Sequence, residues 1–288
     1  MSNLLLISHG VGCPDGFAAA WAANRRHPGI EIWFANHNAP PPNVTDRDVI
    51  ITDFCYPREI LLQMKSDARS LLVLDHHITM QKQCGDLDFC HFDMNKSGAG
   101  LAWEFFHPGI PAPWIIKYVQ YRDLGFYWSR PKEEHPLYLE EILATVDSYE
   151  RSFANWDIIS SIPETDLATS QLVVEGQAIQ RFKNQMINVL LKQAHEIEIG
   201  GHRVKAVNAP LFQSEIGNIL ANDPENDFGA TWYQSREGIK FSLRSIDGKE
   251  DVSQVAEGFP GGGGHKKAAG FSIESLKRLS RDIKLNDR

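Results

Sequence analysis

Short apolar runs alternate with longer amphipathic stretches through the first half of the chain, and this rhythm constrains the fold most. The runs are LLLIS, IEIWFA, DVIITD, SLLVLD and DFCHFD, which begin at residues 4, 30, 48, 70 and 88. LLLIS and LLVLD show little apolar/polar alternation, as is typical of central strands covered on both faces by helices. We therefore predict an α/β domain with a doubly wound, mainly parallel sheet over residues 1–153.

The pattern changes after residue 153. Within 154–194, QLVVEGQAIQRFKNQMINVLLKQA has apolar residues at helical spacing and few breakers, which predicts a connecting helix. Residues 195–288 contain the strand-like runs EIEIG, RVKAVNA, FGATWYQ and IKFSLRS and the helix-like stretches SEIGNILAND and VSQVAEGF. We expect a second, smaller α+β domain here, with the charged tail after Ser275 forming a solvated helix.

Charge and cysteine content exclude several classes of protein. The formal net charge is −8 and the pI is about 5.8, so there is no overall positive field to hold long duplex nucleic acid. The four scattered cysteines suit neither a disulfide framework nor a CxxC zinc or redox motif. With no signal peptide and no apolar run long enough for a membrane helix, we expect a cytoplasmic protein that does not bind membranes.

Polar residues end several of the predicted strands. His9 follows the first run, Asp53 ends the third, and Asp75 begins the triplet Asp75-His76-His77 after the fourth. Open α/β sheets bind ligands at this carboxyl edge. Any single strand-end aspartate could simply cap the following helix. Together with Asp15, however, these side chains favour a dinuclear site, and their oxygen and imidazole donors suit manganese, magnesium or iron.

The string GGGGHKKAAG, from Gly261 to Gly270, is the most specific in the sequence. Consecutive glycines permit positive φ, so their amides can point at an anion while His265 and the two lysines add donors and charge. The string does not fit a Walker A loop. A flexible linker is the alternative, but aliphatic residues flank the block. Arg244 could contact phosphate through its planar fork, although an isolated arginine at a strand edge is more often only solvated.

Four motifs occur in the same order as in a known family: HGVGCPDG, ITDF, LDHH and the C-terminal GGGGHKKAAG. In this combination the chain resembles the DHH phosphoesterase superfamily, in the branch that carries the DHH-associated C-terminal domain, as in RecJ-like exonucleases and nanoRNases. The resemblance covers essentially the whole chain. It implies a phosphoesterase with two divalent metal ions, usually Mn²⁺, and an active site in the cleft between two domains.

The resemblance also implies roles for individual residues. The metal ligands would be His9, Asp15, Asp53, His76 and Asp123, with Asp53 bridging both ions. Asp75 would orient ligands or the attacking water, and His77 would face the scissile phosphate. Asp123, in RDLG, resembles the family's DTG-type motif, and Asp147 is kept as its alternative.

Further positions match the substrate-binding part of the family. The residues that would grip substrate in the second domain are Arg244, Gly261, Gly262, Gly263, Gly264 and His265. Ser97 and Gly98 are further candidates for substrate contact, although a helix N-cap explains Ser97 equally well.

The first motif departs from the family pattern. HxDxDG is usual, whereas this chain has His9-Gly-Val-Gly-Cys13-Pro-Asp15-Gly, with a cysteine in place of a carboxylate. Cys13 could bind a metal as thiolate and favour softer ions, or it could leave that site weak. The CPDG form resembles a branch linked with hydrolysis of oligoribonucleotides or cyclic nucleotides.

These features together predict a metal-dependent phosphodiesterase that degrades short oligoribonucleotides from an end. The alternatives are a 3′-phosphoadenosine 5′-phosphate phosphatase or a cyclic-mononucleotide phosphodiesterase, then a pyrophosphatase or polyphosphatase. An inactive nucleotide-binding module is the alternative from another class, and Cys13 is its only support. The expected partners are short single-stranded RNA or a nucleotide, without long duplexes, and a homodimer is one option for the assembly.

Overall fold

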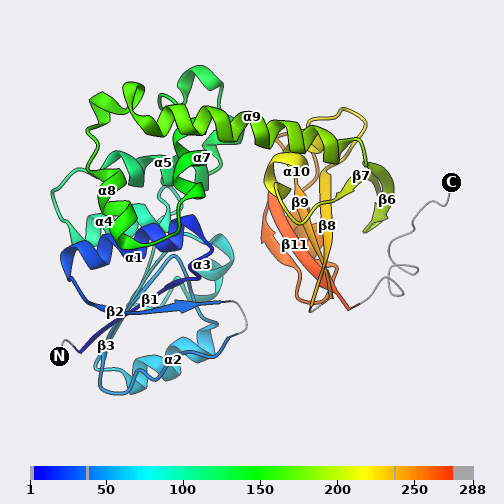
Figure 1. Cartoon of the computed structure of the whole chain (residues 1–288). Coiled ribbons are helices and arrows are strands. Elements are labelled where there is room, and N and C mark those ends of the chain that lie inside the picture. The colour runs from blue at the N-terminus through cyan, green and yellow to red at the C-terminus, as the bar shows by residue number, and fades with distance from the viewer. Residues whose placement is uncertain (1–2, 37–38, 237, 275–288) are drawn as a thin grey trace. The chain divides into compact units, whose positions relative to one another are not determined.

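The chain divides into two compact units in the computed structural model, which describes residues 3–36, 39–236 and 238–274 (Figure 1). The first unit is Met1–Gln180 and the second is Arg181–Arg288. The helix predicted after Ser275 lies outside the described residues. No helix in the described part of the chain is long and apolar enough to cross a membrane.

The first unit is built on a parallel sheet of five strands. They are β1 (Leu4–His9), β2 (Glu31–Ala35), β3 (Asp48–Thr52), β4 (Ser70–Asp75) and β5 (Cys90–Phe92). Their order across the sheet is β2-β1-β3-β4-β5, and every neighbouring pair is parallel. Each strand coincides with one of the apolar runs, so the predicted fold class of this domain is confirmed.

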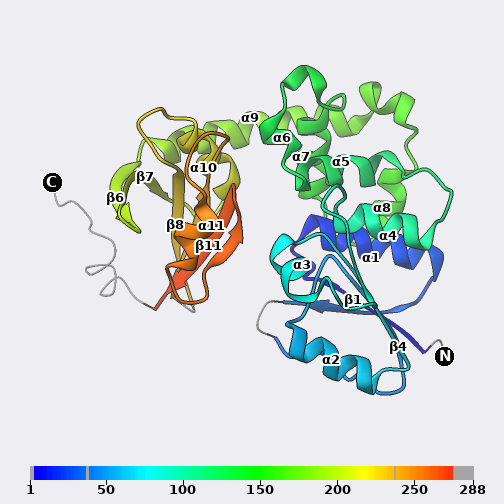
Figure 2. The ribbon, with the colours of Figure 1, turned by 180° about the vertical axis from the view of Figure 1, so that it is seen from behind.

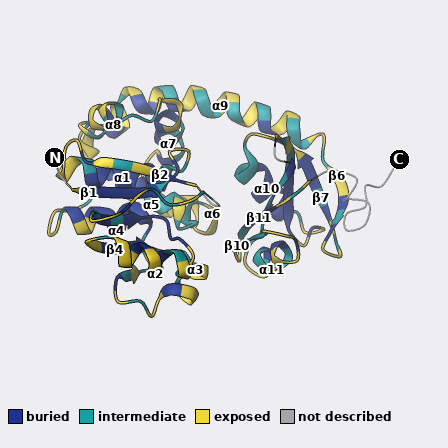
Figure 3. Cartoon of the chain, turned by 90° about the horizontal axis from the view of Figure 1, so that it is seen from below, coloured by how far each residue is buried: buried dark blue, intermediate teal, exposed yellow. Residues whose placement is uncertain are grey.

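Helices cover both faces of this sheet (Figures 1 and 2). The helices described in this unit before α9 (Gln171–Leu191) are α1 (Pro14–Arg26), α2 (Arg58–Asp67), α3 (Ile78–Cys84), α4 (Gly98–Phe106), α5 (Trp114–Asp123), α6 (Phe126–Ser129), α7 (Leu139–Ser148) and α8 (Phe153–Ser160), with a 3₁₀ turn at Lys132–Glu134. On one face Leu6 joins the core formed with α1, α4 and α5. On the other face Leu5 and Ile7 pack with Leu61 and Met64 of α2. Successive residues of β1 are therefore buried on opposite faces, which explains the unalternating run. Figure 3 colours the middle of this strand as buried.

Residues 154–194 contain most of α8, a 3₁₀ turn at Glu164–Thr169 and the helix α9 (Gln171–Leu191). The boundary between the two units falls inside α9, because its first turns pack on α7. The hydroxyl of Thr145 donates to the carbonyl of Leu172 at 2.6 Å. A Cβ added at Gly176 would overlap the carbonyl of Glu141.

In its described residues the second unit has a six-stranded sheet, the end of α9 and two further helices, which confirms the predicted α+β class. The strands are β6 (His195–Ile199), β7 (His202–Asn208), β8 (Gly229–Ser235), β9 (Gly238–Arg244), β10 (Gly263–His265) and β11 (Ala268–Ile273), and the helices are α10 (Gln213–Ala221) and α11 (Val252–Glu257). The order across this second sheet is β10-β11-β9-β8-β7-β6. Among the described strands of this sheet, only β7 and β8 pair in parallel.

The glycine block forms part of this sheet. β10 and β11 pair antiparallel, so the block is a hairpin that continues the sheet beyond β9. Gly261 has φ +69° and Gly264 has φ +142°, values that glycine adopts without the strain that a side chain would bring. At Gly264 an added Cβ would lie 2.6 Å from the carbonyl oxygen of Ala268.

Candidate metal centre

Eight side chains gather at the carboxyl edge of the first sheet, and all of them belong to the first unit. They form three overlapping groups, within each of which the potential ligand atoms lie within 4.8 Å of one another. The groups are Asp53, Asp75, His76 and His77; His9, Cys13 and Asp53; and Asp15, His76 and Asp123. Asp53 and His76 each belong to two groups, so the three form one continuous cluster.

Asp53 lies at the centre of this cluster. It follows β3 directly, with φ +51° and only 2% exposure, and its amide donates to the carbonyl of Leu74. Its Oδ1 lies 3.2 Å from Nε2 of His76, and its Oδ2 lies 3.6 Å from Nδ1 of His9 and 3.5 Å from Sγ of Cys13. Burial alone would raise the pKa of Asp53, but the hydrogen bonds from His76 and His9 outweigh it and hold the pKa well below its usual range. These contacts therefore favour the charged form of Asp53.

The start of α4 packs against both buried aspartates of the cluster. A Cβ at Gly98 would overlap the Cβ of Asp53 and lie 2.7 Å from its Cα. Ser97 caps α4 by accepting from the amide of Gly100 at 3.3 Å, and it also hydrogen-bonds Asp15. The amide of Ala99 donates to Oδ1 of Asp15 at 3.1 Å. Ser97 and Gly98, which the sequence suggested as substrate contacts, thus lie against the carboxylates of Asp15 and Asp53 and hold them in place.

Two buried carboxylate oxygens of the cluster have no hydrogen-bond donor among the described residues. They are Oδ2 of Asp15 and Oδ2 of Asp75, in side chains that are 1% and 0% exposed. Burial, followed by the charges of Asp123 and Asp53, raises the pKa of Asp15 well above its usual value. An unpaired buried oxygen costs about 1–3 kcal/mol, which a bound cation would offset. The donor set of carboxylates and imidazoles fits divalent ions such as Mn²⁺ and Mg²⁺.

The two histidines after β4 take different positions. Nε2 of His76 lies 3.2 Å from Asp53, 3.4 Å from Asp123 and 3.7 Å from Asp15. Burial lowers the pKa of His76, but the hydrogen bond to Asp53 and the negative charges around it raise the pKa to about 10. The carboxylates thus attract positive charge to this point. Nδ1 of His77 lies 2.7 Å from Oδ1 of Asp75, which fixes the orientation of the His77 ring.

Cys13 caps α1 and also reaches the cluster. Its sulfur accepts from the amide of Gly16 at 3.5 Å and lies near Asp53. Burial, and then the charge of Asp53, raises the pKa of the thiol. A cation held by the same carboxylates would act in the opposite direction and favour the thiolate.

The two candidates for the last acidic ligand have different surroundings. Asp123, at the end of α5, joins the group with Asp15 and His76. Asp147 instead accepts from Nη1 of Arg122 at 2.6 Å and from Nη2 of Arg151 at 3.4 Å. Arg151 also donates to the carbonyl of Gly12 at 2.6 Å, so Asp147 supports the loop before Cys13. No motif in the sequence indicates this support.

We expect Asp123→Asn to weaken Mn²⁺ binding at least about tenfold, because it removes a charged donor from the cluster. Asp147→Asn makes the same chemical change outside the cluster and should have a smaller effect. Isothermal titration of both variants with Mn²⁺ measures the difference, with circular dichroism as the check on folding. A larger loss of affinity in Asp147→Asn would show that the two residues have been assigned the wrong way round.

Arg244 and the glycine block lie in the second unit. At the end of β9, the guanidinium of Arg244 donates to Oγ of Ser242 at 2.9 Å and Oγ of Ser214 at 2.8 Å. Its hydrogen bonds within the described residues go only to neutral oxygens. His265, Ala268 and Arg244 are paired in one row across β10, β11 and β9. Paired residues share a face of the sheet, so His265 and Arg244 lie on the same face. Only the methyl side chain of Ala268 stands between them.

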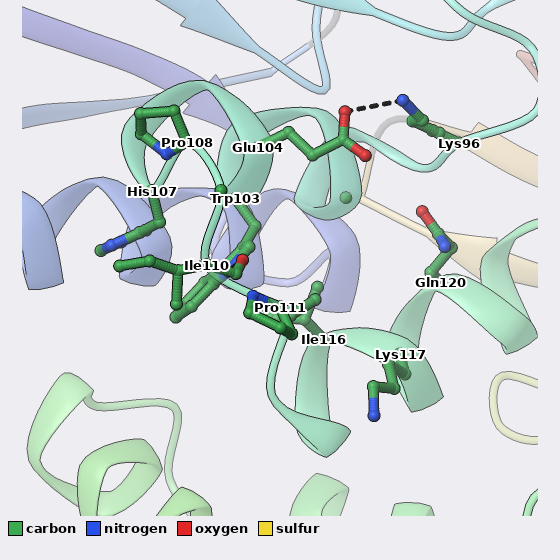
Figure 4. A pocket seen from close by; sticks show the side chains of 13 residues that line it. Lys96, Trp103, Glu104, His107, Pro108, Ile110, Pro111, Ile116, Lys117 and Gln120 are labelled. Atoms are coloured by element: carbon green, nitrogen blue, oxygen red, sulfur yellow. Dashed lines mark hydrogen bonds and ion pairs between the residues drawn. The ribbon is translucent and has the colours of Figure 1, made fainter.

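A pocket of about 600 Å³ lies elsewhere in the first unit, beside α4 and α5 (Figure 4). Trp103, His107, Lys117 and Gln120 are among its lining residues. In this pocket Lys96 pairs with Glu104 at 2.6 Å. Because no residue of the metal cluster lines it, the pocket is distinct from the metal centre.

No family model matches the sequence. The chain is 27% identical to an uncharacterized protein of Acanthamoeba polyphaga mimivirus over 308 aligned residues, which cover 98% of this chain and 70% of that protein. It is 36% identical to oligoribonuclease NrnB of Bacillus subtilis over 113 residues, which cover 38% of this chain and 26% of NrnB.

Several solved structures match this chain over residues of both units. The pGpG-specific phosphodiesterase PggH of Vibrio cholerae matches with a TM-score of 0.52 and 16% identity, over 96% of this chain and 95% of PggH. A DHH domain from a member of a ribosomal-protein family matches with a TM-score of 0.56 and 16% identity, over 93% of this chain and 82% of that one. RecJ of Thermus thermophilus in complex with Mn²⁺ matches with a TM-score of 0.54 and 15% identity, over 96% of this chain and 50% of RecJ. These likenesses identify the two-domain fold.

Proposed function

We infer that this chain is a DHH-type phosphoesterase, and specifically a metal-dependent phosphodiesterase that hydrolyses short oligoribonucleotides. The observation that carries the proposal is the continuous cluster around Asp53, in which buried carboxylates and imidazoles converge at the carboxyl edge of a parallel sheet. Such a donor set serves phosphoryl-transfer chemistry, which needs concentrated positive charge beside the phosphate.

The residues of the cluster divide the work as follows. Two divalent ions would be held by His9, Asp15, Asp53, His76 and Asp123. We propose that Mn²⁺ is one of the ions bound there. Bound there, the ions would activate water and neutralise charge on the phosphoryl oxygens. Asp75 holds the His77 ring in one orientation through the 2.7 Å contact at Nδ1. His77, which is about a quarter exposed, would then donate to a phosphate oxygen.

Features of the second unit support a short substrate. Arg244 and His265 stand on one face of the sheet, and the guanidinium has only neutral hydrogen-bond partners among the described residues. We propose that they bind a phosphate of the substrate, together with Gly261–Gly264. A local cation in a chain of net charge −8 suits a few nucleotides better than a long duplex. Two relatives are named for short substrates, an oligoribonuclease and a pGpG-specific phosphodiesterase, and this favours the same class here.

A substrate panel tests the proposal. Purified protein with Mn²⁺ is offered a 5′-labelled RNA dinucleotide, an RNA 24-mer, cyclic AMP and 3′-phosphoadenosine 5′-phosphate in parallel. We expect preferential loss of the dinucleotide, and loss of all turnover when EDTA removes the metal. Turnover of a mononucleotide alone would replace the proposal with a nucleotide phosphatase or a cyclic-nucleotide phosphodiesterase. No turnover of any of the four substrates with Mn²⁺, Mg²⁺, Co²⁺ or Zn²⁺ would overturn the proposal that the protein is a phosphodiesterase.

A further inference from the structure

We propose that Cys13 is a sulfur ligand of the metal centre, and that the group of His9, Cys13 and Asp53 selects a softer divalent ion, such as Zn²⁺ or Co²⁺, than the rest of the cluster. The proposal rests on the metal centre of the proposed function and concerns which ion each part of that centre takes.

The geometry of this group matches one small coordination sphere. Sγ of Cys13 and Nδ1 of His9 lie 3.5 Å and 3.6 Å from the same oxygen, Oδ2 of Asp53. Zinc binds sulfur at about 2.3 Å, and nitrogen or oxygen at about 2.0–2.2 Å, in a tetrahedral arrangement. From those lengths and the tetrahedral angle, two ligand atoms on one ion lie about 3.4–3.6 Å apart. The sulfur and the imidazole nitrogen therefore already lie at the right separation from the shared oxygen, and all three ligand atoms lie within 4.8 Å of one another.

The loop that carries Cys13 is held in place from several sides. The amide of Cys13 donates to the carbonyl of Gly10 at 2.7 Å, and Arg151 donates to the carbonyl of Gly12. The amide of Gly16 points at the sulfur, at the N-terminus of α1, where negative charge is stabilised. Two residues further on, Asp15 directs a buried oxygen without a donor into the same cluster. This second observation, at the end of the cluster that faces His76, indicates a bound cation independently of the cysteine.

The donor chemistry differs between the two ends of the cluster. His9, Cys13 and Asp53 offer one nitrogen, one sulfur and one oxygen, whereas Asp15, His76 and Asp123 offer two carboxylates and one imidazole. Thiolate favours ions such as Zn²⁺ and Co²⁺, and carboxylate favours Mn²⁺ or Mg²⁺. When the sulfur–metal bond forms, the thiol proton leaves to solvent and no electron is transferred. The centre would then hold two different ions.

Cobalt spectroscopy on the full-length protein tests the proposal, because a sulfur ligand gives Co²⁺ a near-ultraviolet charge-transfer band. The variants are Cys13→Ser and Cys13→Asp. Serine and aspartate are both favoured N-caps, so each can keep α1 capped while changing the metal donor. Cys90→Ser is the matched control, since Cys90 is a half-buried cysteine outside the three donor groups.

We expect the band in the wild type and in Cys90→Ser, and its loss in both Cys13 variants. Cys13→Ser should bind Co²⁺ on the order of 10- to 100-fold more weakly, and Cys13→Asp should shift the preference toward Mn²⁺. Bound Co²⁺ without the band, or a band that survives in both Cys13 variants, would rule out Cys13 as a metal ligand. Neither result would contradict the proposed phosphodiesterase activity. Failure of the wild type to bind Co²⁺ or Zn²⁺ would also overturn the proposal of a sulfur ligand. The RNA assay with Mn²⁺ then shows whether the proposed phosphodiesterase activity must be given up as well.

Discussion

Asp53→Ala should lower turnover of the RNA dinucleotide by about 10³-fold or more while leaving the chain folded. Both oxygens of Asp53 face the cluster, one toward His76 and one toward His9 and Cys13, so the substitution disconnects two of the donor groups at once. The fold should persist because His76 keeps Asp15 and Asp123 as neighbours. The measurements are kcat with Mn²⁺ and the thermal midpoint of the same sample.

Asp53→Asn is the control for backbone strain in this experiment. Position 53 has φ +51°, a region that alanine adopts at some cost and that asparagine tolerates well. If charge is what matters, both variants lose turnover, and Asp53→Asn keeps the thermal midpoint closer to that of the wild type. An active Asp53→Ala enzyme would rule out a central role for this carboxylate.

Gly98→Ala should lower the free energy of unfolding by about 1–3 kcal/mol and turnover by about 100-fold. Replacing glycine by alanine in a helix ordinarily stabilises a protein, so the expected sign is the opposite of the usual one. The reason is that the added methyl group would overlap the Cβ of Asp53, and either α4 or the carboxylate must move. Denaturant unfolding and kcat of the same preparation measure the two effects.

Gly12→Ala is the matched control for Gly98→Ala. Gly12 also lies beside the cluster, but nothing stands within 4 Å of an added Cβ there, and its φ is not in the positive range. It should remain close to the wild type in stability. Wild-type stability and turnover in Gly98→Ala would mean that the contact with Asp53 does not position the carboxylate.

The sequence was sufficient to predict the strands of the first sheet and the residues at their ends. A parallel sheet buried on both faces requires continuous apolar runs, and the runs that end in His9, Asp53 and Asp75 became β1, β3 and β4. Because parallel strands end at one edge, side chains far apart in the chain had to meet there. Asp123 was placed by resemblance to a family motif, and α5 brings it to 3.4 Å from His76.

Other features depend on contacts that no local pattern records. The overlap between Gly98 and Asp53 depends on how closely α4 approaches β3, which is a matter of packing. Asp147 looked like a possible ligand because its residue type is right, but its two arginine partners become visible only once α7 is folded against α5. The glycine block indicated amides that could point at an anion, but its local sequence did not predict that part of it forms a strand paired with β11.

The crowding of Asp15, Asp53 and Asp123 around one imidazole has a consequence for the life of the protein in the cell. A cation that binds these carboxylates binds the folded chain only, since the unfolded chain scatters them. At a free concentration 100 times its dissociation constant, such an ion adds about 2.7 kcal/mol to the stability of the fold. If the proposed ion binds, the fraction of chains that escapes unfolding and proteolysis would depend on the metal supply, and metal starvation would reduce the amount of this protein as well as its activity.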